Sequence, residues 1–230
     1  MSRSRAAAMA LSVILSAALL QGCASDTRAQ QGPSREGGPQ TFADSATAAS
    51  NALVSFRKLA TPDNYRELGF ASLDEVGSAR LGAPLPVSMV QLDQLREYQA
   101  DRDPAMLLTS LHQDYYPVQV QQQTRSAILV EQLDQGWGAV SFGNAGLAQQ
   151  VGALQTRMTA AEGELSDAAI VQVPALGIYF LGHRNRQGEL QLTSLTDHPT
   201  FDIKAGQTLP AREVFASLVP AARDYNELPM

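Results

Sequence analysis

The spacing of apolar residues changes several times along the chain and divides residues 41–230 into helical and extended segments. Between residues 41 and 61, apolar positions recur at intervals of three and four, which predicts an amphipathic helix. Thr41 is the expected N-cap of this helix, and Thr61-Pro62 is expected to end it. Its apolar face consists of Phe42, Ala46, Ala49, Leu53, Phe56 and Ala60.

After Pro84 the period shortens to that of extended chain. Residues 85–90 predict a strand, which the nearby prolines restrict to a sheet edge or to a strand start. Three strand-like runs follow closely, at residues 115–120, 126–133 and 137–142. Because parallel neighbours need a crossover of about a dozen residues or more, these closely spaced strands are expected to be antiparallel. Asp134-Gln135-Gly136 has the length and glycine of a hairpin loop.

The second half repeats this sequence of helix and strands. A helix is predicted between Asn144, its N-terminal cap, and Gly163, its C-terminal cap. Strands are predicted after it at residues 169–173, 178–183 and 189–193. A final helix over residues 210–223 contains Pro220, which is expected to kink or restart it. The prediction is an α+β fold, with an antiparallel sheet of about six or seven strands and three main helices packed on it. Residues 41–230 are expected to form a single domain.

The first residues have a different pattern. Arg3 and Arg5 precede an apolar run over residues 6–20, and Gly22 comes directly before Cys23. This is the order of an export signal, and the run is shorter than the roughly 20 residues of a membrane-spanning helix. Leu20-Gln21-Gly22-Cys23 resembles the lipobox of bacterial lipoproteins, although Gln21 stands where that family mostly has Ala, Ser or Thr.

The lipobox resemblance implies where the protein is located. Residues 1–22 would be removed as a signal peptide, and Cys23 would carry more than one acyl chain, as stable anchoring requires. Ala24 resembles the residue that follows the cysteine in outer-membrane lipoproteins, so the domain is expected to face the periplasm. Residues 23–40 are rich in Gly, Pro, Ser and Gln and predict a flexible tether. The alternatives are inner-membrane retention, ordinary secretion after cleavage near Ala24, or an uncleaved anchor.

Charge and cysteine content exclude several classes of function. Without Arg3 and Arg5 the chain has 15 basic and 23 acidic side chains, a net charge of −8. Nucleic acids and anionic bilayers select clustered Lys and Arg, so neither is an expected partner of the folded domain. Cys23 is the single cysteine. Its lipidation would leave no thiol for a disulfide, a zinc site or a nucleophile.

One segment suggests an enzyme. Residues 139–143 resemble the nucleophile elbow of α/β-hydrolases around Ser141, with Ala139 in place of the first glycine. Asp167 and either His183 or His198 follow in the chain order of that family. The elbow belongs to a parallel sheet, whereas Ser141 ends a predicted antiparallel hairpin. The residues after Ser141 are therefore expected to end the strand and cap the next helix.

Neither a metal nor a cofactor is expected. The histidines His112, His183 and His198 lack the spacing of known zinc sites. Residues 143–146 resemble a glycine loop at a helix start, but no lysine or dinucleotide glycine spacing accompanies them.

Aromatic residues offer one candidate surface for a partner. Tyr115 and Tyr116 are adjacent in a predicted strand, so their side chains lie on opposite faces and one of them is expected to point away from the core. Trp137 lies on a neighbouring strand. Together these residues are a candidate anchor for another protein.

Two functions follow from these patterns. The first is a non-enzymatic binding or scaffolding domain, lipid-anchored to the outer membrane, with another envelope protein as its partner. The alternative is a small envelope serine hydrolase that uses Ser141, Asp167 and a histidine.

Overall fold

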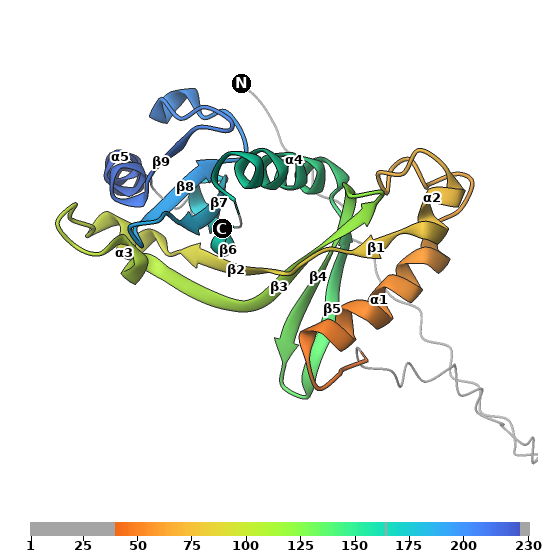
Figure 1. Cartoon of the computed structure of the whole chain (residues 1–230). Coiled ribbons are helices and arrows are strands. Elements are labelled where there is room, and N and C mark those ends of the chain that lie inside the picture. The colour runs from red at the N-terminus through yellow and green to blue at the C-terminus, as the bar shows by residue number, and fades with distance from the viewer. Residues whose placement is uncertain (1–39, 164, 226–230) are drawn as a thin grey trace, which may run out of the picture. The chain divides into compact units, whose positions relative to one another are not determined.

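The computed structural model describes residues 40–163 and 165–225. Cys23, the signal peptide and all of the predicted tether except Gln40 lie outside these residues. The described residues belong to one compact unit and form an α+β fold around a single large sheet (Figure 1).

Nine strands form the described sheet, two or three more than the sequence predicts. They are β1 (Arg80–Leu81), β2 (Leu85–Val90), β3 (Leu108–Val120), β4 (Gln123–Leu133), β5 (Gly136–Gly143), β6 (Ser166–Val173), β7 (Ile178–Arg184), β8 (Leu190–Ser194) and β9 (Thr208–Pro210). The described α-helices are α1 (Ser45–Leu59), α2 (Leu73–Ser78), α3 (Leu92–Arg96), α4 (Ala145–Glu162) and α5 (Ala211–Asp224). The three longest, α1, α4 and α5, are the three that the apolar spacing predicts.

The order of strands across the sheet is β5-β4-β3-β2-β6-β7-β8-β9, with β1 beside β3. All neighbouring strands are antiparallel except β2 and β6, which are parallel. The expectation of a purely antiparallel sheet is therefore wrong. It rested on strands that are close in sequence, whereas β2 and β6 are separated by β3, β4, β5 and α4, which is more than enough chain for a parallel connection.

Helices cover both faces of the sheet (Figure 1). Helix α4 packs on one face, where its buried residues Val151 and Leu154 share a core cluster with side chains of β2, β3, β4, β6 and β7. On the other face, α1 covers β3 and β4 at one end of the strand order. Helices α3 and α5 cover β6, β7 and β8 at the other end. The sheet is therefore the middle of three layers, and alternate residues of its strands are buried on opposite sides.

Local details correct several predicted boundaries. Asp44, not Thr41, is the N-cap of α1, and its carboxylate accepts a 2.8 Å hydrogen bond from the Thr47 amide. This bond, followed by the one from the Thr47 hydroxyl, lowers the pKa of Asp44. Phe42 instead pairs with Trp137 as an isolated bridge on β5. Helix α5 continues through Pro220 rather than restarting there.

The hairpin between β3 and β4 is tighter than the sequence predicts. Gln121 and Gln122 both have positive φ, 51° and 65°, as a two-residue type I′ turn requires. Neither is the glycine or asparagine that usually identifies such a turn. β3 ends at Val120, as predicted, and β4 consequently begins at Gln123, three residues before its predicted start.

Candidate functional site

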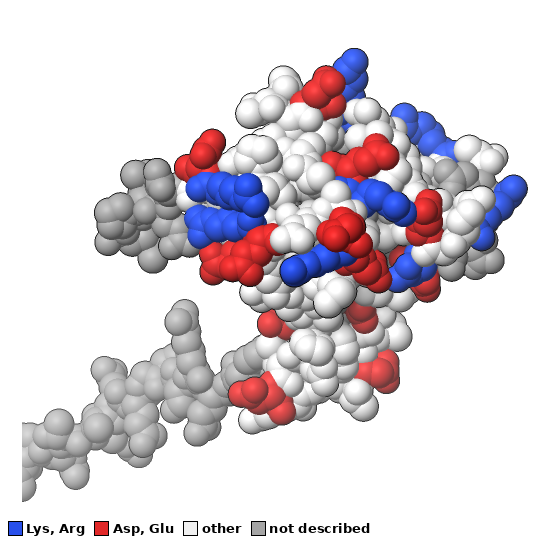
Figure 2. Space-filling model, turned by 90° about the vertical axis from the view of Figure 1, so that its left-hand side faces the viewer, with Lys and Arg blue, Asp and Glu red and all other residues white. Residues whose placement is uncertain are grey.

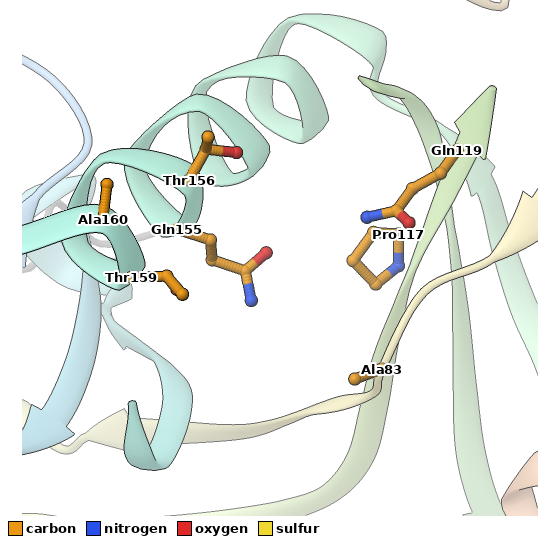
Figure 3. A pocket seen from close by; sticks show the side chains of 7 residues that line it. All are labelled: Ala83, Pro117, Gln119, Gln155, Thr156, Thr159 and Ala160. Carbon is orange, nitrogen blue, oxygen red and sulfur yellow. The ribbon is translucent and has the colours of Figure 1, made fainter. Parts of the chain in front are cut away.

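The clearest candidate site is a cleft of about 460 Å³ between α4 and the end of β3 (Figure 3). Gln119 of β3 and Gln155 of α4 extend their carboxamides into it from opposite walls. All seven described residues that line it are uncharged. They are Ala83, Pro117, Gln119, Gln155, Thr156, Thr159 and Ala160.

The helical wall is held close to the sheet by a glycine. Asn144 is the N-cap of α4, as predicted, and its side chain accepts a hydrogen bond from the Leu147 amide. Its backbone is left-handed, with a φ of 53°. Further along, Gly152 lies directly over Thr124 of β4. A Cβ atom at Gly152 would be 2.3 Å from the Thr124 hydroxyl oxygen, so only glycine allows this approach.

The opposite wall is formed by the end of β3. The register between β3 and β4 shifts between Val118 and Gln119, as in a β-bulge, with Arg125 as the extra residue on β4. Val118 and Val120 are both buried in the cluster under α1, so Gln119 between them points to the face that α4 covers. The amide of Gly82 donates a 2.8 Å hydrogen bond to the carbonyl of Pro117. The Gln119 carboxamide lies within 3.3 Å of the position that a Gly82 Cβ would occupy. Because Gly82 has no side chain, the Gln119 carboxamide can occupy this space.

The chemistry of the cleft is that of neutral hydrogen bonding. A carboxamide offers two N–H donors and an acceptor oxygen, the same types of group as a peptide bond. The Thr156 hydroxyl is already engaged, since it donates to the Gly152 carbonyl at 2.9 Å. Gln119, Gln155 and Thr159 remain as the polar side chains that face a ligand. A charged ligand would lose hydration there without gaining an ion pair, so the cleft suits an uncharged one.

A second cleft, of about 430 Å³, lies between the end of α3, β8 and the start of α5 and contains charges of both signs. In the lining of this cleft, Arg212 forms a 2.7 Å ion pair with Glu189. Arg184, which also lines the cleft, lies 3.6 Å from the carboxylate of Asp167, which does not. Figure 2 shows Lys and Arg interspersed with Asp and Glu on this side of the domain. Because the charges compensate one another and are exposed, this cleft offers little net attraction to an ion.

The residues of the hydrolase alternative are far apart. Ser141 is exposed on β5, and His183 is buried on β7, five strand positions away. At about 4.8 Å per strand, this places them on the order of 24 Å apart along the sheet. His198 lies beyond β8, where its Nε2 is 2.8 Å from the Thr196 hydroxyl. Hydrogen-bond contact between nucleophile and base requires about 3 Å, so the structure does not assemble this catalytic set.

The aromatic residues do not form an exposed anchor either. Tyr115 and Tyr116 do point to opposite faces, as predicted, but both are buried, with 7% and 4% of their surface exposed. Tyr115 packs under α4, while the Tyr116 hydroxyl lies 3.0 Å from that of Ser45 in α1. Burial raises the pKa of both phenols. Trp137 is half-buried against the same cluster as Tyr116. The expectation of an outward tyrosine is wrong, because helices cover both faces.

Metal-binding chemistry finds no support in the described part of the chain, where no group of three or more His, Cys, Asp or Glu side chains converges. Burial lowers the pKa of His198, against the opposite effect of Asp197. Burial therefore favours the neutral form of the His198 imidazole, whose Nε2 lies within hydrogen-bond distance of the Thr196 hydroxyl.

Gln119 and Gln155 are the functional candidates that the sequence pattern does not identify. Neither belongs to a motif, and other glutamines lie close to each in the chain, at positions 121–123 after Gln119 and 149–150 before Gln155. Only the packing of α4 beside the end of β3 distinguishes them, and that packing is not visible in the apolar spacing.

Comparisons place the chain in no known group. None of the helices within residues 40–163 and 165–225 is both long and apolar enough to cross a membrane. A search of protein-family models, of characterised proteins and of solved structures finds no match to this chain.

Proposed function

We propose that this protein is an envelope lipoprotein whose folded domain binds a partner through the cleft between α4 and β3. The partner presents an uncharged amide group to Gln119 and Gln155. One observation carries this proposal: two carboxamides converge from separate, rigidly packed elements on a space large enough for a small ligand. The membrane anchor rests on the lipobox resemblance of residues 20–23.

Binding suits this site better than catalysis does. No titratable side chain is among the described residues of its lining, so nothing there exchanges a proton near neutral pH. The polar side chains of the lining come from a helix and a strand rather than from loops, which favours a preformed site. Recognition through paired carboxamides would accept either a peptide backbone or the acetamido group of an amino sugar, since both present an N–H beside a carbonyl.

The cleft is tested by titrating the full-length protein with two uncharged probes, end-blocked trialanine and the disaccharide of N-acetylglucosamine. We expect one of them to shift the side-chain amide resonances of Gln119 and Gln155 in NMR spectra. Gln155→Ala removes the hydrogen bonds made by one wall, and we expect it to weaken binding by about 2- to 10-fold.

The matched control is Gln150→Ala, because Gln150 is an exposed glutamine of the same helix that does not line the cleft. It should leave affinity unchanged. Binding of the peptide alone identifies a polypeptide partner, and binding of the sugar alone identifies a glycan. Equal loss in both variants, or no shift with either probe, would contradict the proposed site.

The lipid anchor is tested by labelling producing cells with radioactive palmitate. The wild-type protein should incorporate the label and partition with membranes, because an acylated cysteine is the attachment point. Cys23→Ser should abolish both. Label that persists in Cys23→Ser would refute lipidation at this residue, whatever the outcome at the cleft.

A further inference from the structure

The outer side of β5 is an incompletely used sheet edge. β5 is the last strand at its end of the sheet, and β4 is its neighbour on the inner side. On the outer side, the pairing within the described residues is a single bridge, in which Phe42 and Trp137 exchange two 2.8 Å backbone hydrogen bonds. Backbone groups alternate in direction along a strand, so the N–H and C=O of Ala139 also point outward. Beyond the bridge, no residue within 40–163 and 165–225 pairs with the outer side of residues 139–142.

Two of the side chains along this edge, Val140 and Phe142, are apolar and exposed. Val140 is 44% exposed, and Phe142 is 36% exposed although its ring stacks on Phe56 at 5.9 Å. Val140 is an extra residue opposite β4, where the register shifts between Leu129 and Val130. Soluble proteins usually protect a sheet edge with Lys, Pro, a β-bulge or very short strands, and the extra residue Val140 is the one such feature of β5. The opposite edge follows that rule, since β9 has three residues and ends at Pro210.

The charges near the start of β5 are of one sign. No Lys or Arg occurs between Arg125 and Arg157, a stretch that includes all of β5. Glu131 of β4 is opposite Gly138, Asp134 lies in the turn before β5, and Asp44 is two residues from the bridge. The lower part of Figure 2, where the β4–β5 turn lies, correspondingly shows acidic and no basic side chains. An occupant of this edge would be favoured by a cation near Trp137.

We propose that residues 139–142 of β5 accept an extended segment of another protein as an additional strand. The segment carries apolar side chains at alternate positions and a Lys or Arg at the end beside the β4–β5 turn. The backbone hydrogen bonds supply affinity, and the alternate side chains, packed beside Phe142 and Val140, supply selectivity. This docking edge is separate from the cleft, which is lined by α4, β3 and the chain between β1 and β2.

A second copy of this chain is a poorer occupant. Pairing two β5 edges in the parallel sense would place two sets of Glu131, Asp134 and Asp44 side by side, and like charges across an interface oppose association. In the antiparallel sense the acidic start of one β5 would face the end of the other, and residues 126–156 of that copy supply no Lys or Arg. A basic segment of another protein would instead be attracted by these carboxylates. The charge of the edge therefore selects a partner different from the chain itself.

The proposal is tested with Trp137, the single tryptophan of the chain, as an internal fluorescent reporter next to the edge. The probes are short, end-blocked peptides of alternating Val and Thr with one Lys at the first or the last position. We expect one of them to change Trp137 emission in the full-length protein, in a saturable manner. Replacing the Lys of that peptide by Glu should weaken binding by about tenfold.

Backbone pairing is tested separately. Methylating the alternate peptide amides that face β5 should abolish binding, because those amides donate the interstrand bonds. Ala139→Pro should weaken binding by about tenfold, since it removes an outward N–H without removing a bond to β4. Ala139→Ser keeps the N–H and is the matched control, with thermal unfolding used to verify that both variants fold.

Three results would overturn the proposal. The first is binding that survives amide methylation. The second is an emission change that depends on protein concentration without peptide, which would identify a second copy as the occupant. The third is at least tenfold tighter peptide binding after residues 30–39 are replaced by alternating Gly and Ser, which would identify the chain's own upstream segment as the occupant.

Discussion

Phe56→Ala is expected to lower the free energy of unfolding by about 3–5 kcal/mol, the usual cost of emptying a fully packed aromatic site. Phe56 has no exposed surface and lies between α1 and the sheet. Its ring also contacts Phe70 at 5.8 Å and Phe142 at 5.9 Å, so the cavity would be bordered by other aromatic rings. Since whole domains are stable by only about 5–15 kcal/mol, this change should be evident in urea unfolding.

Phe142→Ala provides the comparison. It removes the same ring–ring contact with Phe56 from the other side, but Phe142 is 36% exposed and leaves a site open to water. We expect a clearly smaller loss of stability. If the two variants were equally destabilised, the stacking contact rather than burial would dominate, and the placement of α1 on the sheet would need revision.

Gly152→Ala is expected to destabilise the protein by about 1–3 kcal/mol, although alanine is the better helix former by about 1 kcal/mol. The new Cβ would lie 2.3 Å from the Thr124 hydroxyl oxygen and 2.4 Å from its Cβ. Thr124 is itself buried on β4 and has a short side chain that leaves little room to move. The helix would have to shift away from the sheet, and thermal or urea unfolding would register the cost.

Gly146→Ala is the matched control for this substitution. Gly146 lies in the first turn of the same helix, and no atom comes within 4 Å of the position its Cβ would take. Here the helix propensity acts alone, and the variant should gain up to about 1 kcal/mol. Opposite signs for one substitution at two positions of α4 would support the close approach at Gly152. Stabilisation by both would contradict it.

The sequence predicts those parts of the fold that depend on local periodicity. Helices α1, α4 and α5 and the β4–β5 hairpin are confirmed, because each carries an apolar repeat and a recognisable turn or cap. The pairing of β2 with β6 could not be predicted in this way. It joins strands that are far apart in the chain, and periodicity indicates which face of a strand is buried but not which strand lies beside it.

The same limit explains the candidate sites. Alternation correctly assigns Tyr115 and Tyr116 to opposite faces, yet whether a face is covered depends on where α1 and α4 pack. Gln119 and Gln155 become a site only when α4 packs beside the end of β3. Lipidation of Cys23, in contrast, can be predicted from a short sequence motif without knowledge of the tertiary structure. Because Cys23 lies outside the described residues, its lipidation stays a prediction.

The parallel pair of β2 and β6 has a consequence for how the domain unfolds. It is the one junction between two groups of strands, each of which is otherwise built from antiparallel pairs. Helix α4 follows the first group in the chain and precedes the second, and its buried face contacts Leu85 of one group and Leu181 of the other. Loss of either group would expose the same helix to water. The two halves of the sheet therefore depend on one shared layer, and they should melt together in a single cooperative transition.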